Sequence, residues 1–556
     1  MPGKQSKARV KRAKTITSKY FLYFTAFFSG MSVMAIELGA SRLLAPYFSS
    51  SQIIWTIIIG TIMIALAIGN VTGGRLVDKN SDPLLLYIRL FIAACWTAAI
   101  PFAGKYVITA VSLGLASFIK TNFLIWASFI SCMLVFVFPL ILLGTVSPAL
   151  VKMCAQRLDN NGRIVGELSA LNTIGCILGT FLPTFVTIPA VGTAATFLIF
   201  SGILIIICLI YFISAGVYVI RGAVTLAIVI ALLLFPVNNS FAFWESNLLY
   251  EGESIYNYLQ VKDTPNSVIF STNVMEGVQS IMMKNDELTG MYFEYALAGP
   301  LIAGIPLGKE VTNTARDYEL LTLGLGTGTF ATQCLKYFPL VSFDGVEIDE
   351  KIVWLAAEFF RLPIDVRAIV DDGRMFLDKS GVYDVILVDA YQDITIPFQM
   401  SSYEFFGMVK EHLKENGLMV VNLNMRSEKE GSLNHYICDT IASQFPYVYT
   451  MPLHTSTNTI LFASSYPDAL DRLRVRLAEL EELEDGAPLR SLMNDLLDRL
   501  KRYESSGLML TDDKAPVEML GMRVIDELIG SSLEYYQRVF KEHGLLGLLR
   551  SMGITG

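Results

Sequence analysis

The sequence predicts a multispan α-helical membrane domain joined to an α/β Rossmann-like domain with a small N-terminal β subdomain. The first observation is composition: 53% of the 556 residues are hydrophobic and 17% are charged, against roughly 25% charged in soluble domains. The second is charge distribution, since residues 1–237 carry 17 of the 43 Lys and Arg residues but 5 of the 51 Asp and Glu residues. The third is an alternation of apolar strands and helical stretches from residue 318 onward, which is typical of a parallel sheet. The mean hydropathy of +0.49 excludes an ordinary soluble enzyme and a disordered protein.

Seven stretches of the first half are apolar enough to cross a membrane, which takes about 20 residues. They lie near residues 20–45, 52–74, 84–102, 121–146, 166–188, 192–213 and 219–237. Residues 103–118 form a weaker apolar stretch, so we count seven spans and allow an eighth. The basic leader, residues 1–19, runs into a full-length span, which argues against a cleavable signal peptide. We therefore expect a transmembrane domain over 20–237 in the lipid bilayer.

Glu37 stands out among the few ionisable residues within the spans. It follows the apolar run 21–36 and precedes Arg42, but five residues on a helix is a poor spacing for an ion pair. One interpretation is a cation or proton site in the bundle. The other is an interfacial charge at a helix end that satisfies a neighbour.

After residue 237 the pattern changes. Short β-rich runs at 258–261 and 268–270 predict a small β subdomain over 238–300. We expect an α/β domain over 301–465 and a C-terminal helical segment over 466–556. Within that segment, residues 467–499 are charge-rich with a helical period, which favours a surface helix packed on the sheet. A dimerisation helix, and with it a homodimer, is the second interpretation.

A glycine-rich turn follows the first strand of the α/β domain. Gly324, Gly326 and Gly328 surround Thr327, and a helix follows. Glycines at such a turn let the backbone approach a ligand closely. Twenty-three residues after Gly324 comes Glu347, at the end of the second strand, where a carboxylate can accept both hydroxyls of a ribose.

Further acids follow the next strands. Asp349 lies beside Glu347, Asp372 and Gly373 follow the third strand, and Asp389 ends the fourth. Taken singly, each acid is as readily explained as a solvated loop charge. The carboxyl ends of parallel strands meet at one edge, however, so together these residues predict a nucleoside site.

Other chemistry is disfavoured by composition. The seven cysteines show no CxxC spacing and the four histidines are scattered, so we expect no metal site. The acidic balance of residues 238–556 suits cationic substrates and argues against nucleic acid as a partner.

These motifs resemble those of spermidine synthases. The matching segments are Glu-Ser-x-Tyr-Asn at 253–257, the glycine turn, Val-Glu-Ile-Asp at 346–349, Asp-Asp-Gly-Arg at 371–374, Tyr-Asp-Val-Ile-Leu-Val-Asp-Ala-Tyr at 383–391 and Thr-Asp-Asp-Lys-Ala-Pro at 511–516. The run 37–47 also resembles the bacterial lineage that fuses a multispan membrane region to a spermidine-synthase-like domain. The resemblance implies a Rossmann-like fold of the class I S-adenosylmethionine methyltransferase type.

In spermidine synthases an amine attacks the aminopropyl carbon of decarboxylated S-adenosylmethionine and releases methylthioadenosine. The resemblance implies that Asp389 is the base, Glu347 the ribose ligand and Asp372 the adenine ligand. Donor-binding residues would be Tyr256, Asn257, Gly324, Gly326, Thr327, Gly328, Glu347, Asp349, Asp372 and Gly373. Amine-binding candidates are Tyr391, Gln392, Asp393, Asp512 and Asp513.

Three positions depart from the family pattern. Asn257 stands where soluble enzymes usually have Gln. Thr327 and Gln392 stand where those enzymes have Asp, on the donor ammonium and the acceptor amine respectively. The leading hypothesis is a membrane-embedded aminopropyltransferase that acts on a polyamine such as putrescine. The alternatives are an S-adenosylmethionine-dependent methyltransferase and a non-catalytic transporter or sensor that binds a nucleoside or polyamine.

The location follows from charge and from the donor. Positive-inside reasoning places the leader in the cytoplasm of a bacterial plasma membrane, so seven spans would put the acidic half outside and eight would put it inside. Because the donor nucleoside is cytoplasmic, we expect an even span count and a cytoplasmic soluble domain. The first half's own role, polyamine passage or anchoring, is left open.

Overall fold

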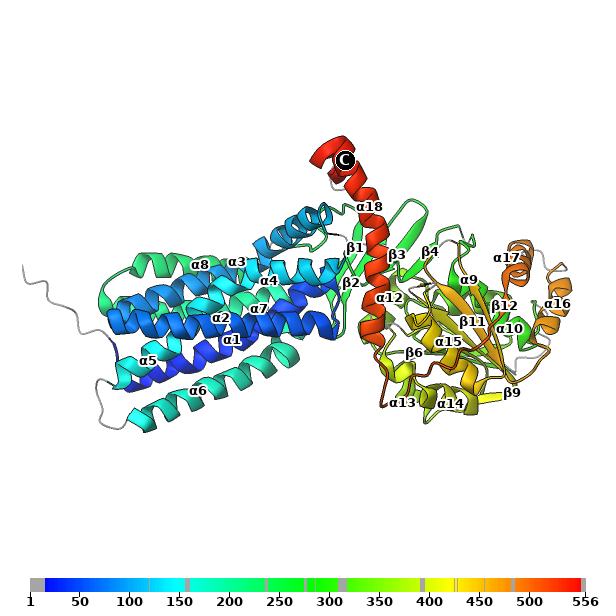
Figure 1. Cartoon of the computed structure of the whole chain (residues 1–556), viewed down its shortest axis with the longest axis horizontal. Helices are drawn as coiled ribbons and strands as arrows, with labels where there is room; N and C mark the ends of the chain where they lie inside the picture. The colour runs from blue at the N-terminus through cyan, green and yellow to red at the C-terminus, as the bar shows by residue number, and fades with distance from the viewer. Residues whose placement is uncertain are drawn as a thin grey trace, which may run out of the picture. The chain divides into compact units, whose positions relative to one another are not determined.

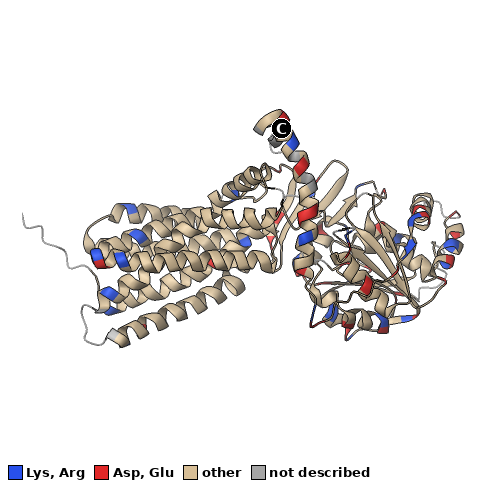
Figure 2. Ribbon diagram, in the orientation of Figure 1, with Lys and Arg blue, Asp and Glu red and all other residues tan. Residues whose placement is uncertain are grey.

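The computed structural model describes residues 16–119, 121–155, 161–235, 239–274, 278–285, 287–308, 318–390, 396–424, 426–427, 429–454, 456–481 and 486–551. The chain forms two compact units, one of residues 1–243 and 540–548 and one of residues 244–539 and 549–556. We call them the helical unit and the α/β unit (Figure 1). Charged residues are sparse along the helices of the first and frequent in the second (Figure 2).

The helical unit consists of long apolar helices. They are α1 (Lys19–Phe48), α2 (Gln52–Lys79), α3 (Pro83–Ala116), α4 (Phe123–Gly144), α5 (Val146–Ala155), α6 (Asn161–Leu182), the π-helical turn η1 (Pro183–Thr187), α7 (Ile188–Ala215) and α8 (Val219–Leu234). By length and composition, five continuous stretches are candidate membrane spans: Lys19–Phe48, Gln52–Lys79, Pro83–Ala116, Phe123–Cys154 and Gly162–Ala215. Helix α8 is a shorter apolar helix.

The stretch Gly162–Ala215 contains two passes. Its 54 residues would extend about 80 Å at 1.5 Å per residue, more than twice the hydrocarbon thickness of about 30 Å. The helical conformation breaks at Gly192, whose φ of 81° lies in the left-handed region. Residues 103–116, the weaker stretch of the sequence, continue α3 and form no separate span.

The directions of the helices follow from their contacts. The pairs that fix them are Lys19–Glu167 and Met31–Gly179 for α1 and α6, Ile16–Ser214 and Gly39–Phe197 for α1 and α7, Thr25–Tyr87 and Leu43–Gly104 for α1 and α3, Phe212–Gly222 and Gly202–Val229 for α7 and α8, and Gly69–Gly144 and Gly73–Thr145 for α2 and α4. These pairs show that α1, α3, α6 and α8 run one way and α7 the other, and that α2 and α4 are parallel to each other. Only three residues separate α1 from α2, and the chain turns back there (Figure 1). The described helical unit thus holds seven lengths of helix: six lie within the candidate membrane spans, and the seventh is the shorter α8.

The segment after α8 contacts the far ends of these helices. Tyr47, at the C-terminal end of α1, donates to the carbonyl of Phe241 at 3.0 Å. Lys105 of α3, which is buried, donates to the carbonyl of Ser240 at 2.9 Å. The chain thus leaves the helical bundle at the end opposite to that at which α1 begins.

The α/β unit begins with a four-stranded antiparallel sheet. Its strands, in spatial and sequence order, are β1 (Leu248–Glu253), β2 (Tyr258–Asp263), β3 (Ser267–Ser271) and β4 (Ser280–Met283). Alternate residues of β2 and β3 pack against α12 (Glu350–Phe359), among them Leu259, Val261 and Phe270. This is the small β subdomain that the sequence predicts.

The second sheet has eight strands in the order β12-β10-β11-β9-β8-β5-β6-β7. They are β5 (Tyr318–Leu323), β6 (Val341–Glu347), β7 (Val366–Val370), β8 (Tyr383–Val388), β9 (Leu413–Leu423), β10 (Tyr447–Pro452), β11 (Thr459–Ser464) and β12 (Lys501–Arg502). Strands β5 to β9 are parallel, as predicted, and β10 to β12 add an antiparallel edge. Connecting helices include α11 (Thr329–Tyr337), α13 (Gly373–Leu377), α14 (Tyr403–Glu411) and α15 (Leu433–Gln444).

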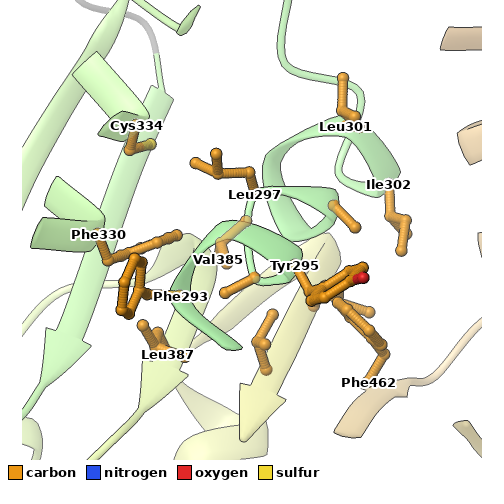
Figure 3. Close-up of a cluster of buried hydrophobic side chains, with 14 of the residues drawn as sticks. Phe293, Tyr295, Leu297, Leu301, Ile302, Phe330, Cys334, Val385, Leu387 and Phe462 are labelled. Carbon is orange, nitrogen blue, oxygen red and sulfur yellow. The ribbon is translucent and has the colours of Figure 1, made fainter. Parts of the chain in front are cut away.

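The core lies between the larger sheet and the short helices α9 (Tyr292–Tyr295) and α10 (Ala298–Ile302). Figure 3 shows Leu297 of this segment near Val385 of β8 and Tyr295 near Phe462 of β11, within one cluster of buried side chains. The charge-rich stretch 467–499 forms α16 (Ala469–Glu479) and α17 (Gly486–Arg499). Its apolar face joins the same core, as expected for a helix packed on its own domain. The long C-terminal helix α18 (Val517–Ser551) follows.

Candidate active site

The glycine turn lies at the point where the order of the parallel strands reverses, between β5 and its neighbours β6 and β8. Gly324 has a φ of 97°, and a Cβ there would lie 2.3 Å from the carbonyl oxygen of Asp389. The turn therefore passes directly beside the end of β8, which only glycine permits. Thr327 is fully buried, with its hydroxyl 3.5 Å from that of Thr329. Open α/β sheets bind ligands at such a reversal point.

Glu347 ends β6 and is held by backbone N–H groups. Gly326 donates to one carboxylate oxygen at 2.9 Å and Asp349 to the other at 3.2 Å. Burial raises the pKa of the Glu347 carboxyl to about 7, the two N–H groups lower it, and neighbouring Asp349 raises it. The glycine turn and this carboxyl thus form one hydrogen-bonded unit.

The turn between β1 and β2 is fixed to the same place. Ser254 donates to the buried carboxylate of Asp349 at 2.5 Å, and its hydroxyl accepts from the backbone N–H groups of Tyr256 and Asn257 at 3.1 and 2.9 Å. Asp349 also caps α12 through the N–H of Lys351. The turn that carries Tyr256 and Asn257 is therefore fastened to Asp349, two residues after Glu347.

Asp372 follows β7 and caps α13. One of its carboxylate oxygens accepts from the N–H groups of Arg374 and Met375, both at 3.0 Å. The preceding residue, Asp371, donates its N–H to the carbonyl of Glu347 at 3.2 Å. The third strand end is thereby tied to the second.

Asp389 ends β8 and is held by side chains. Tyr292 of α9 donates to one oxygen at 2.7 Å, and Asn422 of β9 donates to the other at 2.8 Å. The side chain keeps some solvent exposure, yet surrounding protein atoms raise the pKa of Asp389 to about 7 by desolvation. Both donated hydrogen bonds lower this pKa, and Glu347 raises it.

The remaining predicted residues are Asp512, Asp513, residues 391–393, Glu37 and Arg42. Asp512 is engaged by both terminal nitrogens of Arg374, at 2.8 and 2.7 Å, and by Ser402 at 2.6 Å, while Asp513 is exposed. Residues 391–393, which include the candidates Tyr391, Gln392 and Asp393, lie outside the described residues. Glu37 and Arg42, both partly exposed, belong to α1 of the helical unit. Across the described ranges, no three His, Cys, Asp or Glu residues group closely enough to hold a metal ion.

Known proteins share this arrangement of motifs. Residues 300–469 match the family model of the spermine/spermidine synthase domain. The chain is 45% identical, over 359 residues, to a probable polyamine aminopropyl transferase of Bifidobacterium longum, covering 62% of this chain and 78% of that protein. The chain belongs to the polyamine aminopropyltransferase family. It is 25% identical to a polyamine aminopropyltransferase of Vibrio vulnificus over 309 residues, covering 52% of this chain and 96% of that protein. A solved structure of a probable spermidine synthase from Corynebacterium glutamicum is 20% identical, with a TM-score of 0.35, covering 45% of this chain and 94% of that one.

The chain is thus an enzyme of the spermidine-synthase-like lineage that carries a multihelix apolar region. Two residues of this candidate site, Tyr292 and Asn422, were not predicted from the sequence. Tyr292 sits in a short apolar helix with no motif to mark it. Asn422 left a usable signal, because it is a polar residue within the apolar run 418–423 at the carboxyl end of a fifth parallel strand.

Proposed function

We propose that this aminopropyltransferase transfers the aminopropyl group of decarboxylated S-adenosylmethionine to a polyamine such as putrescine and releases methylthioadenosine. The observation that carries the proposal is the meeting of the glycine turn, Glu347 and Asp389 at the reversal point of one sheet. The ionisable groups that the described contacts bring to these strand ends are acids, and nearby Arg374 is occupied by Asp512. An acidic site suits a sulfonium donor and an amine acceptor, which are both cationic.

The nucleoside would occupy the β5–β7 side of the edge. Glu347 would accept hydrogen bonds from the two ribose hydroxyls, and Asp372 would bind the amino group of adenine through the oxygen that does not cap α13. Tyr256 and Asn257, fixed through Ser254, would line the same pocket. Each role is a carry-over from the family motif onto a residue whose position favours it.

The transfer would take place beside Asp389. The amine donates its lone pair to the carbon next to the sulfonium, the carbon–sulfur bond breaks, and its electrons return to sulfur. The attacking nitrogen loses a proton to Asp389, whose pKa near 7 matches a base at neutral pH. Tyr292 and Asn422 would hold this carboxylate toward the amine.

A second candidate is methyl transfer from intact S-adenosylmethionine. Thr327 motivates it, because the turn lacks the Asp with which soluble spermidine synthases bind the ammonium of the decarboxylated donor. The test is incubation of the full-length protein, purified in detergent, with putrescine and each donor, followed by mass spectrometry. Methylthioadenosine with spermidine supports aminopropyl transfer, S-adenosylhomocysteine supports the second candidate, and neither product contradicts both.

The helical unit would span a bacterial plasma membrane. A cytoplasmic α/β unit needs an even number of passes, whereas the described helices make seven, and the chain leaves the bundle opposite the start of α1. With the leader in the cytoplasm by its charge, seven passes predict residues after 243 on the outer side, whereas the cytoplasmic donor of the proposed reaction predicts them on the inner side. The two predictions exclude each other, and reporter fusions separate them.

Sidedness is tested with two reporters fused in parallel after residue 556, one active only outside the cytoplasm and one fluorescent only inside it. An active first reporter with a dark second one would support the seven-pass arrangement and count against a cytoplasmic donor. Fluorescence with no outer activity would contradict the seven-pass arrangement and restore the cytoplasmic one.

A further inference from the structure

Asp389 is the first member of a chain of three side chains. Asn422 Nδ2 donates to Asp389 Oδ1 at 2.8 Å, and Asn458 Nδ2 donates to Asn422 Oδ1 at 2.8 Å. Asn422 is buried in β9, and Asn458 immediately precedes the neighbouring strand β11. No sequence motif marks Asn458.

The donors and acceptors in this series of hydrogen bonds are fixed by the ionised carboxylate of Asp389. An ionised carboxylate only accepts hydrogen bonds, so Asn422 must turn its amide nitrogen toward Asp389. The amide oxygen of Asn422 then faces Asn458, which must present a donor. A reversed Asn422 would place its oxygen against Asp389, an arrangement that is favourable only when the carboxyl is protonated.

The backbone holds Asn458 in place. Its carbonyl accepts from the N–H of Leu453 at 2.9 Å, which closes the connection between β10 and β11. The carbonyl of the preceding residue, Thr457, accepts from the N–H of Arg426 at 2.8 Å, and the Arg426 side chain donates to the carbonyl of Leu453 at 2.8 Å. Asn458 therefore stands on a loop tied to the segment that follows β9.

We propose that Asn458 is a positioning residue, which orients the Asn422 amide so that Asp389 is kept ionised and available as the base. The inference rests on the proposed function, because it concerns the base of that reaction. The other titratable groups facing Asp389 from the described elements are Tyr292 of α9 and Glu347 of β6.

Asn458→Asp should reverse the order of hydrogen-bond donors and acceptors along these three side chains. The new carboxylate accepts where the amide donated, so Asn422 turns its nitrogen toward position 458 and its oxygen toward Asp389. We expect the acidic limb of the kcat–pH profile to move up by about one pH unit, with activity about tenfold lower below the limb and recovered above it. Asn458→Leu removes the donor without adding charge, and we expect a shift of the same sign of about half a unit.

The experiment measures kcat from pH 5.5 to 9.5 with saturating substrates for the full-length wild type and both variants. Methylthioadenosine binding and the melting temperature are measured alongside. Amine titration is common to all three proteins and cancels. A shift in both variants with unchanged nucleoside binding supports the proposal. A shift in Asn458→Asp alone assigns the effect to charge and overturns it, as does an unchanged profile or an equal loss at every pH. A wild type that forms no methylthioadenosine instead refutes the proposed function.

Discussion

Glu347 and Asp389 end the two strands that flank β5, and burial raises the pKa of each carboxyl to about 7. Their partners differ. Backbone N–H groups donate to Glu347, whereas a tyrosine and an asparagine side chain donate to Asp389. A backbone N–H only donates and its direction is set by the turn, while a hydroxyl can reverse its role and an amide can turn over. The proposed nucleoside end is thus held by the backbone, and the proposed transfer end is held by side chains that substitution can change.

The largest effect is expected from Asp389→Asn. The variant keeps the shape of the side chain but has no proton acceptor of useful basicity, so kcat should fall by about 10²–10⁴-fold. Binding of methylthioadenosine, measured by calorimetry, should stay within about twofold, because Asp389 lies at the transfer end. Asp378→Asn, at an exposed acid of the same unit, is the control. Retained turnover would remove Asp389 from the mechanism.

Glu347→Gln should act on the other end. Hydrogen bonds to a charged group contribute about 1.5–3 kcal/mol, so methylthioadenosine should bind about ten- to hundredfold more weakly. The acidic limb of kcat at saturating donor should change little in comparison. A larger loss in kcat than in nucleoside affinity would contradict the division between Glu347 at the nucleoside end and Asp389 at the transfer end.

Tyr292→Phe should have a smaller effect on the transfer end. It removes one donor from Asp389 while keeping the ring, so kcat should fall about tenfold. The hydrogen bond of Tyr292 lowers the pKa of Asp389, so its loss should move the acidic limb of the pH profile upward.

Tyr295→Phe is the matched control for that profile. Tyr295 lies on the same helix but donates to Asp495 at 2.7 Å, away from the strand ends. Its removal should alter melting and leave the pH profile in place. Equal profile shifts in the two variants would mean that α9 acts through packing alone.

The sequence predicts the parts of the molecule that rest on local patterns. Long apolar runs predict the membrane-type helices. The alternation of apolar strands with helical stretches, together with the glycine turn, predicts strands β5 to β8 and the acids that end them. The number of passes is harder, because residues 103–116 are apolar enough to suggest a span and yet continue α3. Only contacts such as Gly39 with Phe197, far apart in the chain, reveal the directions of the helices.

In the site, too, residues with local partners are predictable from the sequence and residues with distant partners are not. Glu347 is visible from sequence because its partners Gly326 and Asp349, 21 and 2 residues away, lie in or directly after one β–α–β unit of β5, α11 and β6. The partners of Asp389 come from positions 97 and 33 residues away, and no period or spacing marks them. That Asp512 binds the amine stays a prediction, and its salt bridge with Arg374, 138 residues away, is a contact that the motif does not encode.

The smallest effect is on stability, and it separates the two carboxyls most sharply. The folded pKa of each is about 7, above the ordinary values of 3.8 for Asp389 and 4.5 for Glu347. Between those values the folded state holds a proton that the unfolded state has released, so stability falls as pH rises through this window and stays reduced above pH 7. Removing the charge should therefore stabilise the protein at pH 8, with the gain vanishing near pH 4.

Only Asp389→Asn should show this gain, by roughly 1–3 °C in melting temperature. The new amide at position 389 can donate to Tyr292, whose hydroxyl also accepts, and can accept from Asn422. In Glu347→Gln the new amide nitrogen faces a backbone N–H that cannot accept, so one donor is left unpaired and offsets the gain. Melting curves of the full-length protein at pH 5 and pH 8 measure both. Equal stabilisation of the two variants would show that backbone and side-chain partners hold these acids in the same way.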